Sequence, residues 1–280
     1  MLSWVHRLAR WPLWALHGLG ALGGWGVWLM SPSYRRVWRA QTQQAGLSGW
    51  ARWSSIAHAG MQVAEMPRIW LGQPVPWRWE GAGAMDRALL HGQGLLFLTP
   101  HLGCFELTAR AYAASHGAQK PITVMFRPPR KAALDEVLAQ ARSAPGLNPV
   151  PASVGGIKHM LKALKAGHAV GLLPDQVPPD GLGQWAPWFG RDAYTMTLPA
   201  KLAAVSPSPV LLLAWGERLP WGRGYVVHVR PWAESGEPPL SADPVQAAQQ
   251  LNRAMQWVIG QCPAQYLWGY PRYKPPRAMS

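Results

Sequence analysis

The stretch that decides the fold is Gly94-Leu-Leu-Phe-Leu-Thr-Pro-His-Leu-Gly-Cys-Phe-Glu-Leu107. Its first half is a short apolar run bounded by Gly and Pro, which is typical of a fully buried strand. The residues from Phe105 to Ser115 are predicted to form a helix, so His101 lies on the connection between strand and helix. In an open α/β sheet, ligands bind outside the carboxyl ends of the strands, and this position therefore favours a functional role for His101.

The rest of the chain alternates between strand-like and helix-like segments. Four more strands are predicted, at residues 122–126, 169–173, 210–215 and 225–230. Helices are predicted at residues 34–70 (interrupted near 46–49), 86–91, 131–142, 157–166, 197–204 and 244–259. The stretches 72–79 and 175–190 are rich in Pro and Gly and are predicted to be turns and loops. This alternation indicates an α/β fold with a mixed, largely parallel central sheet flanked by helices.

The N-terminal part of the chain is basic and contains a long uncharged stretch. From Met1 to Ala64 there are six arginines and no acid, in a chain whose formal net charge is +14. Residues 11–30 carry no formal charge and have the length of roughly 20 residues that a spanning helix needs. We predict an N-terminal apolar membrane-anchor helix within residues 1–33, spanning or in-plane, followed by one catalytic domain in residues 34–280. A buried core helix is the alternative, whereas a cleaved signal peptide is disfavoured because no A-x-A site follows.

The charge pattern favours an anionic membrane surface as a partner, because clustered arginines beside an apolar stretch attract acidic lipid head groups. Nucleic acid is not expected, since the chain has no zinc-finger spacing, RNA-binding signature or helix-turn-helix pattern. Cys104 and Cys262 are the two cysteines, too few for a disulfide scaffold or a four-ligand zinc site. We predict that the protein works without a metal or a cofactor.

His101 and Glu106 form an H-x4-E pair that suits general base catalysis. Two helical residues at this spacing would point about 140° apart, so the pair requires His101 on a loop and Glu106 in the first helical turn. Gly103 permits the close turn. The carboxylate then fixes the imidazole tautomer, and the other ring nitrogen takes a proton from an acceptor hydroxyl. In a chain with nine His and thirteen acids, one such pair is expected by chance about as often as not. The alternative therefore stays open that His101 is a hydrogen-bonded loop residue and that Glu106 complements the dipole at the helix N-terminus.

Other polar residues follow predicted strands and therefore reach the same edge of the sheet. Arg127 follows the strand at 122–126, where a guanidinium can bind phosphate or stabilise an oxyanion. Asp175 and Gln176 follow the strand at 169–173. We assign all three to substrate binding. The alternatives are a surface Arg at a strand end and a turn Asp after Pro174.

Two further features are assigned no catalytic role. Cys104 lies in an apolar context, which favours packing over a nucleophilic thiolate. The helix predicted at residues 157–166 has one apolar face, and its lysines at positions 158, 162 and 165 line another face. We expect that basic face to be solvated, although contacts to an acidic carrier protein or a lipid phosphate stay open.

A family resemblance is carried by five segments that occur together and in order. They are Phe97-Leu-Thr-Pro-His-Leu-Gly-Cys-Phe-Glu-Leu107, Met125-Phe-Arg-Pro128, Gly171-Leu-Leu-Pro-Asp-Gln176, Pro187-Trp-Phe-Gly190 and Gln265-Tyr-Leu-Trp268. With them the chain resembles, over nearly its whole length, the bacterial lipid A biosynthesis acyltransferases of the lauroyl/myristoyl type, within the lysophospholipid acyltransferase superfamily. The resemblance implies that His101 is the general base, Glu106 its orienting partner, Arg127 a phosphate or oxyanion contact and Asp175 a residue that shapes the site.

The resemblance also implies transfer of a fatty acyl chain, usually from acyl carrier protein, to a lipid hydroxyl at the cytoplasmic face of the inner membrane. We therefore expect an O-acyltransferase that takes its acyl chain from a thioester of acyl carrier protein (or acyl-CoA) and acts on a lipid A precursor or a related glycolipid. The sequence departs from the family, in which Asn-Trp commonly stands where this chain has Cys104-Phe105, so the acceptor stays open. A lysophospholipid or aminolipid acceptor is the alternative within this class, and a non-catalytic basic membrane-binding protein is the alternative outside it.

Overall fold

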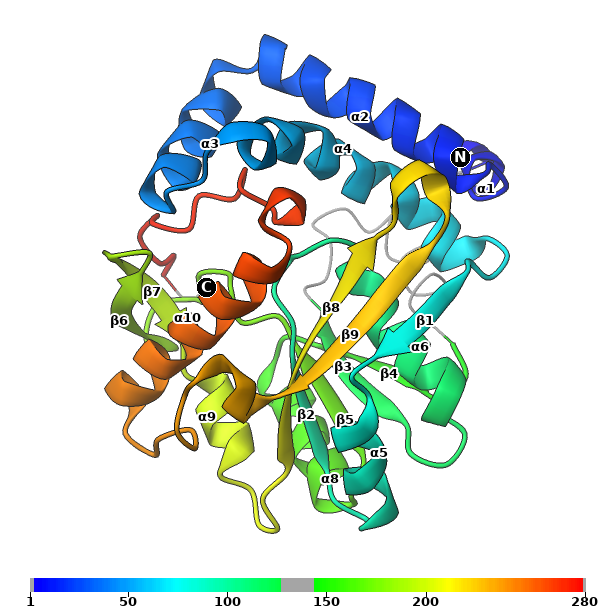
Figure 1. Cartoon of the computed structure of the whole chain (residues 1–280). Helices are drawn as coiled ribbons and strands as arrows, with labels where there is room; N and C mark the ends of the chain where they lie inside the picture. Colours follow the sequence, from blue (N-terminus) through cyan, green and yellow to red (C-terminus); the bar gives the residue numbers. More distant parts are fainter. Residues whose placement is uncertain (1–2, 127–143, 279–280) are drawn as a thin grey trace.

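The computed structural model describes residues 3–126 and 144–278 (Figure 1). In this part of the chain one sheet has seven strands in the order β1-β9-β8-β2-β5-β3-β4. Their bounds are β1 Trp77–Glu80, β2 Leu95–Leu98, β3 Ile122–Phe126, β4 Leu147–Pro151, β5 Ala169–Leu172, β8 Val210–Arg218 and β9 Tyr225–Pro231. The strands β8, β2, β5, β3 and β4 are mutually parallel, whereas β9 is antiparallel to β8 and parallel to β1. The predicted α/β class with a mixed, largely parallel sheet is confirmed.

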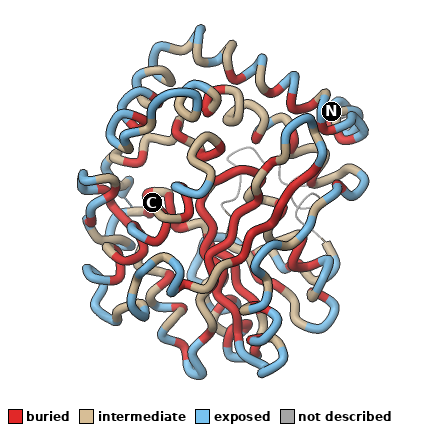
Figure 2. Tube along the Cα trace, in the orientation of Figure 1, coloured by how far each residue is buried: buried red, intermediate tan, exposed pale blue. Residues whose placement is uncertain are grey.

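The helices flank both faces of this sheet. Their bounds are α5 Gly83–Leu90, α6 Phe105–His116, α8 Val154–Lys165, α9 Leu198–Ala203 and α10 Pro244–Gln261, with short 3-10 turns η2 Pro220–Gly222, η3 Trp232–Ser235 and η4 Pro263–Gln265. Strand β2 shows how the two cores form, because successive side chains of a strand point to opposite faces. Leu96 and Leu98 join the core with α8, α9 and α10, and Leu95 and Phe97 join the core with α5 and α6. Buried residues therefore concentrate along the central strands (Figure 2).

Four N-terminal helices form a separate layer at one end of the sheet: α1 Ser3–Leu8, α2 Leu13–Met30, α3 Pro32–Gln44 and α4 Gly49–Leu71. This N-terminal layer, α1–α4, lies at the top of Figure 1. Its helix α4 reaches the loop that follows β2, because the side chain of Gln62 donates a hydrogen bond to the carbonyl of Gly103 at 3.0 Å. The layer thus covers the sheet edge at which His101 lies.

The prediction of an apolar membrane-anchor helix in residues 1–33 is corrected here. A helix does form in the uncharged stretch, as α2, but no helix of the described residues combines the length and apolarity that crossing a membrane requires. His17 and several glycines lower the hydropathy of this segment. The helix instead packs along α4 with five buried residues, Leu13, Leu16, His17, Gly20 and Gly24.

Glycines let α2 and α4 approach closely. A Cβ atom on Gly20 would lie 2.6 Å from the Cα atom of Met61, and one on Gly24 would collide with the carbonyl of Ile56. On the other helix, a Cβ atom on Gly60 would collide with the carbonyl of Gly20. Helix backbones can touch in this way only where both present small residues. The glycines that weaken this stretch as a membrane span therefore serve its packing against α4.

Several elements differ from the sequence-based expectations. Most of β1 lies in the stretch at 72–79 that was expected to form turns, and the strand β4 was not expected. The expected loop at 175–190 contains the strand β6 Gly183–Trp188, which forms a hairpin with β7 Arg191–Met196. The hairpin turn places Phe189 at φ 48° and Gly190 at φ 78°, as a two-residue turn with two left-handed residues requires. The dipeptide Phe-Gly is not a usual signal for such a turn, and a proline at position 187 argues against a strand in the local sequence. The helix expected at 131–142 lies outside the described residues.

Candidate active site

The site begins where two neighbouring parallel strands end. Leu98 of β2 pairs with Leu172 of β5, and the next residue, Thr99, donates its N–H to the carbonyl of Leu172 at 3.0 Å. The two loops therefore leave the sheet side by side. Because each loop continues through a proline, Pro100 or Pro174, helix formation directly after the strand is disfavoured. This local geometry brings His101 and Asp175 together although 74 positions separate them.

His101 and Asp175 form a two-point contact. The Nδ1 atom of His101 lies 2.7 Å from Oδ1 of Asp175, and the backbone N–H of His101 donates to Oδ2 at 2.9 Å. The carboxylate is buried at 2% exposure, while the imidazole is 15% exposed. Nε2 of His101 faces the side-chain amide of Gln176 at 3.0 Å. Asp175 thus holds Nδ1 of the ring, and the neutral amide of Gln176 faces Nε2.

These contacts agree on one tautomer of His101. An ionised carboxylate only accepts hydrogen bonds, so Nδ1 carries the proton, and Nε2 is then free to accept from the Gln176 amide. Burial by itself would raise the pKa of Asp175, but the charge and hydrogen bonds of His101, with a smaller contribution from Arg272, outweigh it and lower that pKa. Asp175 is therefore ionised at neutral pH. The arrangement can act as a general base through Nε2.

The loop that carries His101 is held at nearly every backbone group. Leu267 donates its N–H to the carbonyl of His101 at 3.1 Å, Gly103 donates to the carbonyl of Gln265 at 3.0 Å, and Cys104 donates to the carbonyl of Gly216 at 2.7 Å. Gly103 adopts φ 57°, a left-handed conformation that favours glycine. The chain therefore turns at Gly103, although this turn does not bring Glu106 into a hydrogen bond with the His101 ring.

Glu106 occupies the place that the sequence predicted, but another carboxylate holds the imidazole. His101 is on a loop, and Glu106 is the second residue of α6. Among the described residues, however, the hydrogen bonds of the His101 ring go to Asp175 and Gln176 and none goes to Glu106. The Glu106 side chain instead lines a narrow crevice beside α4 and acts electrostatically on Arg110, one turn further along α6. Its expected contact with His101 is thus replaced by one from Asp175.

Of the other site residues predicted from the sequence, two lie in the part of the chain that the structure describes and one lies outside it. Asp175 and Gln176 do reach the edge at which His101 lies, as their position after a strand indicated. Arg127 lies outside the described residues. Residues that the sequence did not single out also support the site, since Gln62 holds the Gly103 carbonyl and the Tyr270 hydroxyl accepts from Val177, next to Gln176, at 2.9 Å. The family segment Gln265–Trp268 was the one available signal that the C-terminal stretch takes part.

Cys104 is poorly suited to nucleophilic chemistry. It is 3% exposed, and burial, followed by the nearby Glu65 carboxylate, raises the pKa of its thiol well above the ordinary value. The lysines of α8 at positions 158, 162 and 165 are exposed, as a solvated face would be. Within the described ranges, no cluster of three or more His, Cys, Asp or Glu side chains is arranged to hold a metal ion.

Comparisons with known proteins point to one family. The family model described as bacterial lipid A biosynthesis acyltransferase matches residues 52–275. The lipid A biosynthesis palmitoleoyltransferase of Escherichia coli is 26% identical over 220 residues, which cover 77% of this chain and 68% of that protein. The lipid A biosynthesis lauroyltransferase of the same organism is 26% identical over 182 residues, or 65% of this chain and 56% of that protein. A lipid A biosynthesis acyltransferase of Haemophilus influenzae is 25% identical over 190 residues, or 67% and 56%.

Proposed function

The chain belongs to the bacterial lipid A biosynthesis acyltransferase family and is accordingly an acyltransferase, and on that premise we propose its reaction. A fatty acyl chain moves from a thioester, on acyl carrier protein or coenzyme A, to a hydroxyl of a lipid A precursor or a related glycolipid. The observation that carries this proposal is the His101–Asp175 pair at the joint ends of β2 and β5. The matched region includes both of these loops.

The proposed reaction uses His101 Nε2 as the base. In the free protein the amide of Gln176 donates to Nε2, so Gln176 occupies the position that an acceptor hydroxyl must take. When that hydroxyl replaces it, its oxygen attacks the thioester carbon and its proton passes to Nε2. The C–S bond then breaks, and the proton goes on to the leaving thiolate, so that ester and free thiol are the products. Ionised Asp175 stabilises the imidazolium between these steps.

Two predicted residues keep a place in this proposal on other grounds. We keep Glu106 as a second carboxylate of the site, with a smaller role than that of Asp175, because it follows the His101 loop directly. The part proposed for Arg127, binding a substrate phosphate or the oxyanion, rests on the family resemblance alone. Both assignments are open to substitution experiments.

Acyl transfer to defined acceptors tests the proposal. We expect the full-length protein, supplied with radiolabelled acyl carrier protein, to label a lipid A precursor, and we expect the variant His101→Ala to lose that transfer. The matched control is His159→Ala, because His159 is an exposed histidine on α8. Label on a lysophospholipid or an aminolipid alone would overturn the acceptor. Unchanged transfer by His101→Ala would remove His101 from the mechanism. If the intact protein transfers no acyl chain from any donor, the alternative of a non-catalytic membrane-binding protein is favoured.

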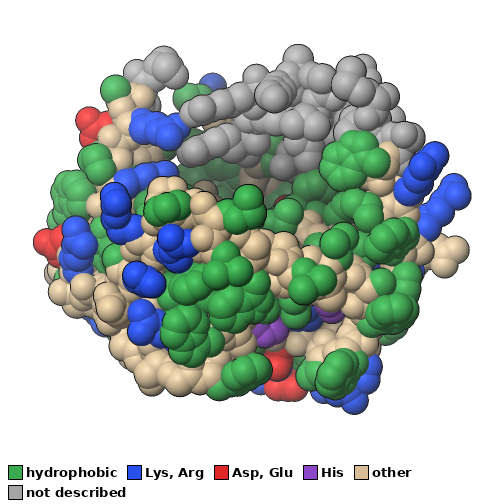
Figure 3. Space-filling model, turned by 90° about the horizontal axis from the view of Figure 1, so that it is seen from above, with side chains coloured by type: hydrophobic (Ala, Val, Ile, Leu, Met, Phe, Trp, Pro, Cys, Tyr) green, Lys and Arg blue, Asp and Glu red, His purple; other side chains and the backbone are tan. Residues whose placement is uncertain are grey.

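We also propose that the N-terminal layer rests on an anionic lipid surface, on the cytoplasmic side of the inner membrane. Viewed from above, this layer displays clustered hydrophobic side chains with basic side chains around them (Figure 3). The most exposed include Leu22 at 74%, Met30 at 84% and Trp50 at 84%. Apolar patches of this kind on a protein surface mark interaction sites, and Trp suits the membrane interface. Arg36 and Arg39 on α3 are exposed at the same layer.

Vesicle flotation tests this surface. We expect the protein to bind phosphatidylglycerol vesicles more tightly than phosphatidylcholine vesicles. Replacing Arg36 and Arg39 by Gln should weaken binding to the former by about 2 kcal/mol, since each basic residue near such a surface contributes about 1 kcal/mol. The matched control replaces Lys158 and Lys162 on α8 by Gln. Equal losses in the two variants would show that net charge, and not this face, decides the binding.

A further inference from the structure

Helix α4 presents one side to the surface and the other to the His101 loop. Val63 is 64% exposed, whereas its neighbour Gln62 is 4% exposed. The Nε2 atom of Gln62 donates to the carbonyl of Gly103 at 3.0 Å. Because Gly103 is two residues beyond His101, this hydrogen bond joins the N-terminal layer to the catalytic loop across the thickness of one helix.

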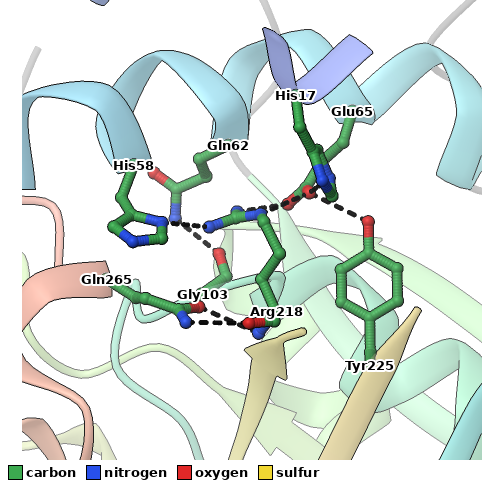
Figure 4. Close-up of polar contacts among 8 residues, drawn as sticks. All are labelled: His17, His58, Gln62, Glu65, Gly103, Arg218, Tyr225 and Gln265. Atoms are coloured by element: carbon green, nitrogen blue, oxygen red, sulfur yellow. Dashed lines mark hydrogen bonds and ion pairs between the residues drawn. The ribbon is translucent and has the colours of Figure 1, made fainter. Parts of the chain in front are cut away.

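A buried ion network fixes α4 in this position (Figure 4). Glu65, one turn beyond Gln62, is 1% exposed and accepts from Arg218 at 2.6 and 2.8 Å. Its oxygen Oε2 also contacts the ring of His17 on α2 and the hydroxyl of Tyr225 on β9, each at 2.9 Å. The carboxylate thereby ties α2 and α4 to the ends of β8 and β9. Breaking such a buried pair leaves an uncompensated charge, so α4 has little freedom to shift.

The same network reaches Gly103 from its other side. The side chain of Gln265 accepts from the backbone N–H of Arg218 at 2.9 Å and donates to the carbonyl of Arg218 at 3.0 Å. The backbone carbonyl of Gln265 accepts the N–H of Gly103 at 3.0 Å. Gly103 is thus held on its carbonyl by Gln62 and on its N–H by Gln265, and Figure 4 shows both glutamines beside Arg218.

We infer that Gln62 is a positioning residue for acyl transfer, which aligns the His101 imidazole by holding the Gly103 carbonyl. The inference rests on the base role proposed for His101. Gln62 has no contact with the imidazole among its hydrogen bonds in the described chain, so it acts through the loop. Misplacing a catalytic group by about 1 Å can cost about a hundredfold in rate. Loss of the Gln62 donor therefore lowers turnover while the substrate-binding surfaces stay in place.

The test replaces Gln62 by Met, which keeps the length of the side chain but cannot donate. In the acyl-transfer assay we expect kcat to fall about 10- to 100-fold with KM for the acyl donor unchanged. The matched control is Gln44→Met, because Gln44 makes the same kind of bond, at 2.7 Å, from α3 to the carbonyl of Phe189. Gln62→Leu, which also lacks the donor, replaces Gln62→Met if that variant does not fold, as judged by thermal unfolding.

A double-mutant cycle separates positioning from plain structural support. If Gln62 acts through the imidazole, then Gln62→Met in an Asp175→Asn background lowers kcat by less than it does alone, because both changes impair the same ring, one its position and the other its tautomer. Full additivity, or a kcat equal to that of Gln44→Met, overturns the inference. His101→Ala in the same assay reports on the proposed function itself. Transfer retained by His101→Ala overturns both proposals, whereas transfer lost there but retained by Gln62→Met overturns this inference alone.

Discussion

Asp175 and Glu65 are both buried carboxylates bound to a histidine, and comparing them separates the pair that we propose to be reactive from one that is structural. Glu65 has four groups on its two oxygens, from Arg218, His17 and Tyr225, all of them buried. Asp175 binds His101, whose ring is 15% exposed and whose outer nitrogen faces a neutral amide. A His–carboxylate contact is therefore no evidence of catalysis in itself. What matters is whether the far ring nitrogen can meet a substrate.

The two carboxylates also differ in what keeps them ionised. Burial would raise the pKa of each, yet both are lowered. For Glu65 the full charge of Arg218 outweighs burial and brings the pKa to about 2. For Asp175 the balance depends first on His101. Glu65 and Arg218 thus form a fixed ion pair that holds helices together. The Asp175 carboxylate, in contrast, can stabilise His101 when the ring takes up a proton.

The largest effect is expected at the reactive pair. Replacing Asp175 by Asn keeps the shape but lets the side chain stabilise the wrong tautomer of His101. Since a well-oriented general base contributes about 10²- to 10⁴-fold, we expect kcat to fall within that range. Thermal unfolding should change little. A variant that loses stability in proportion to its activity would place Asp175 in the structural class with Glu65.

The next largest effect is expected at the structural pair, and on stability. Arg218→Met leaves Glu65 buried without its cation, which should lower the free energy of unfolding by about 3–5 kcal/mol. The control is Arg253→Met, which breaks the surface pair with Glu237, where Arg253 is 54% exposed, and should cost under about 1 kcal/mol. Urea denaturation of both variants measures the difference. Equal losses would contradict the distinction between buried and surface pairs.

A smaller effect concerns pH. Burial, followed by the charge of Arg218, lowers the pKa of His58 to about 4, and its Nδ1 accepts from Arg218 at 3.1 Å. As the pH falls from about 6.5 towards 4, the unfolded chain binds a proton at this histidine and the folded chain does not, so stability decreases. Measured as unfolding free energy against pH, His58→Gln should remove about 3 kcal/mol of this decrease.

The matched control for the pH experiment is His159→Gln, because His159 is exposed. Its stability curve should follow that of the unmodified protein. If the His58→Gln curve does so as well, His58 binds its proton at the same pH in the folded and the unfolded chain, and its contact with Arg218 does not lower its pKa.

The smallest effect is expected at Glu106. Because Asp175 already holds the imidazole, Glu106→Gln should lower kcat less than tenfold, which corresponds to under about 1.4 kcal/mol. Steady-state transfer rates measured beside those of Asp175→Asn check the order. A loss at Glu106 as large as that at Asp175 would return Glu106 to the orienting role that the H-x4-E spacing first indicated.

Much of the sheet was predictable because its central strands are marked locally. The apolar run Leu95–Leu98 and the segment Ile122–Phe126 lie where they were predicted, since a strand buried on both faces consists almost entirely of apolar residues. The edge strand β1, with the sequence Trp-Arg-Trp-Glu, has polar residues in alternation and lies beside a turn-rich stretch. It pairs with β9, whose residues are about 150 positions away in the chain. A local sequence pattern cannot predict such a pairing.

The sequence by itself determined which residues are candidates for the chemistry and that they lie at the carboxyl ends of buried strands. It placed His101 on a loop after a buried strand and Asp175 after another, because apolar runs ended by proline are local signals. The tertiary structure alone decided which carboxylate holds the imidazole. Glu106 is five residues from His101 and lies in the first turn of a helix. Asp175 is 74 positions away and is brought within hydrogen-bonding distance by the pairing of β2 with β5. It also decided that the uncharged N-terminal stretch packs on α4, since His17 finds a buried partner only in the folded chain.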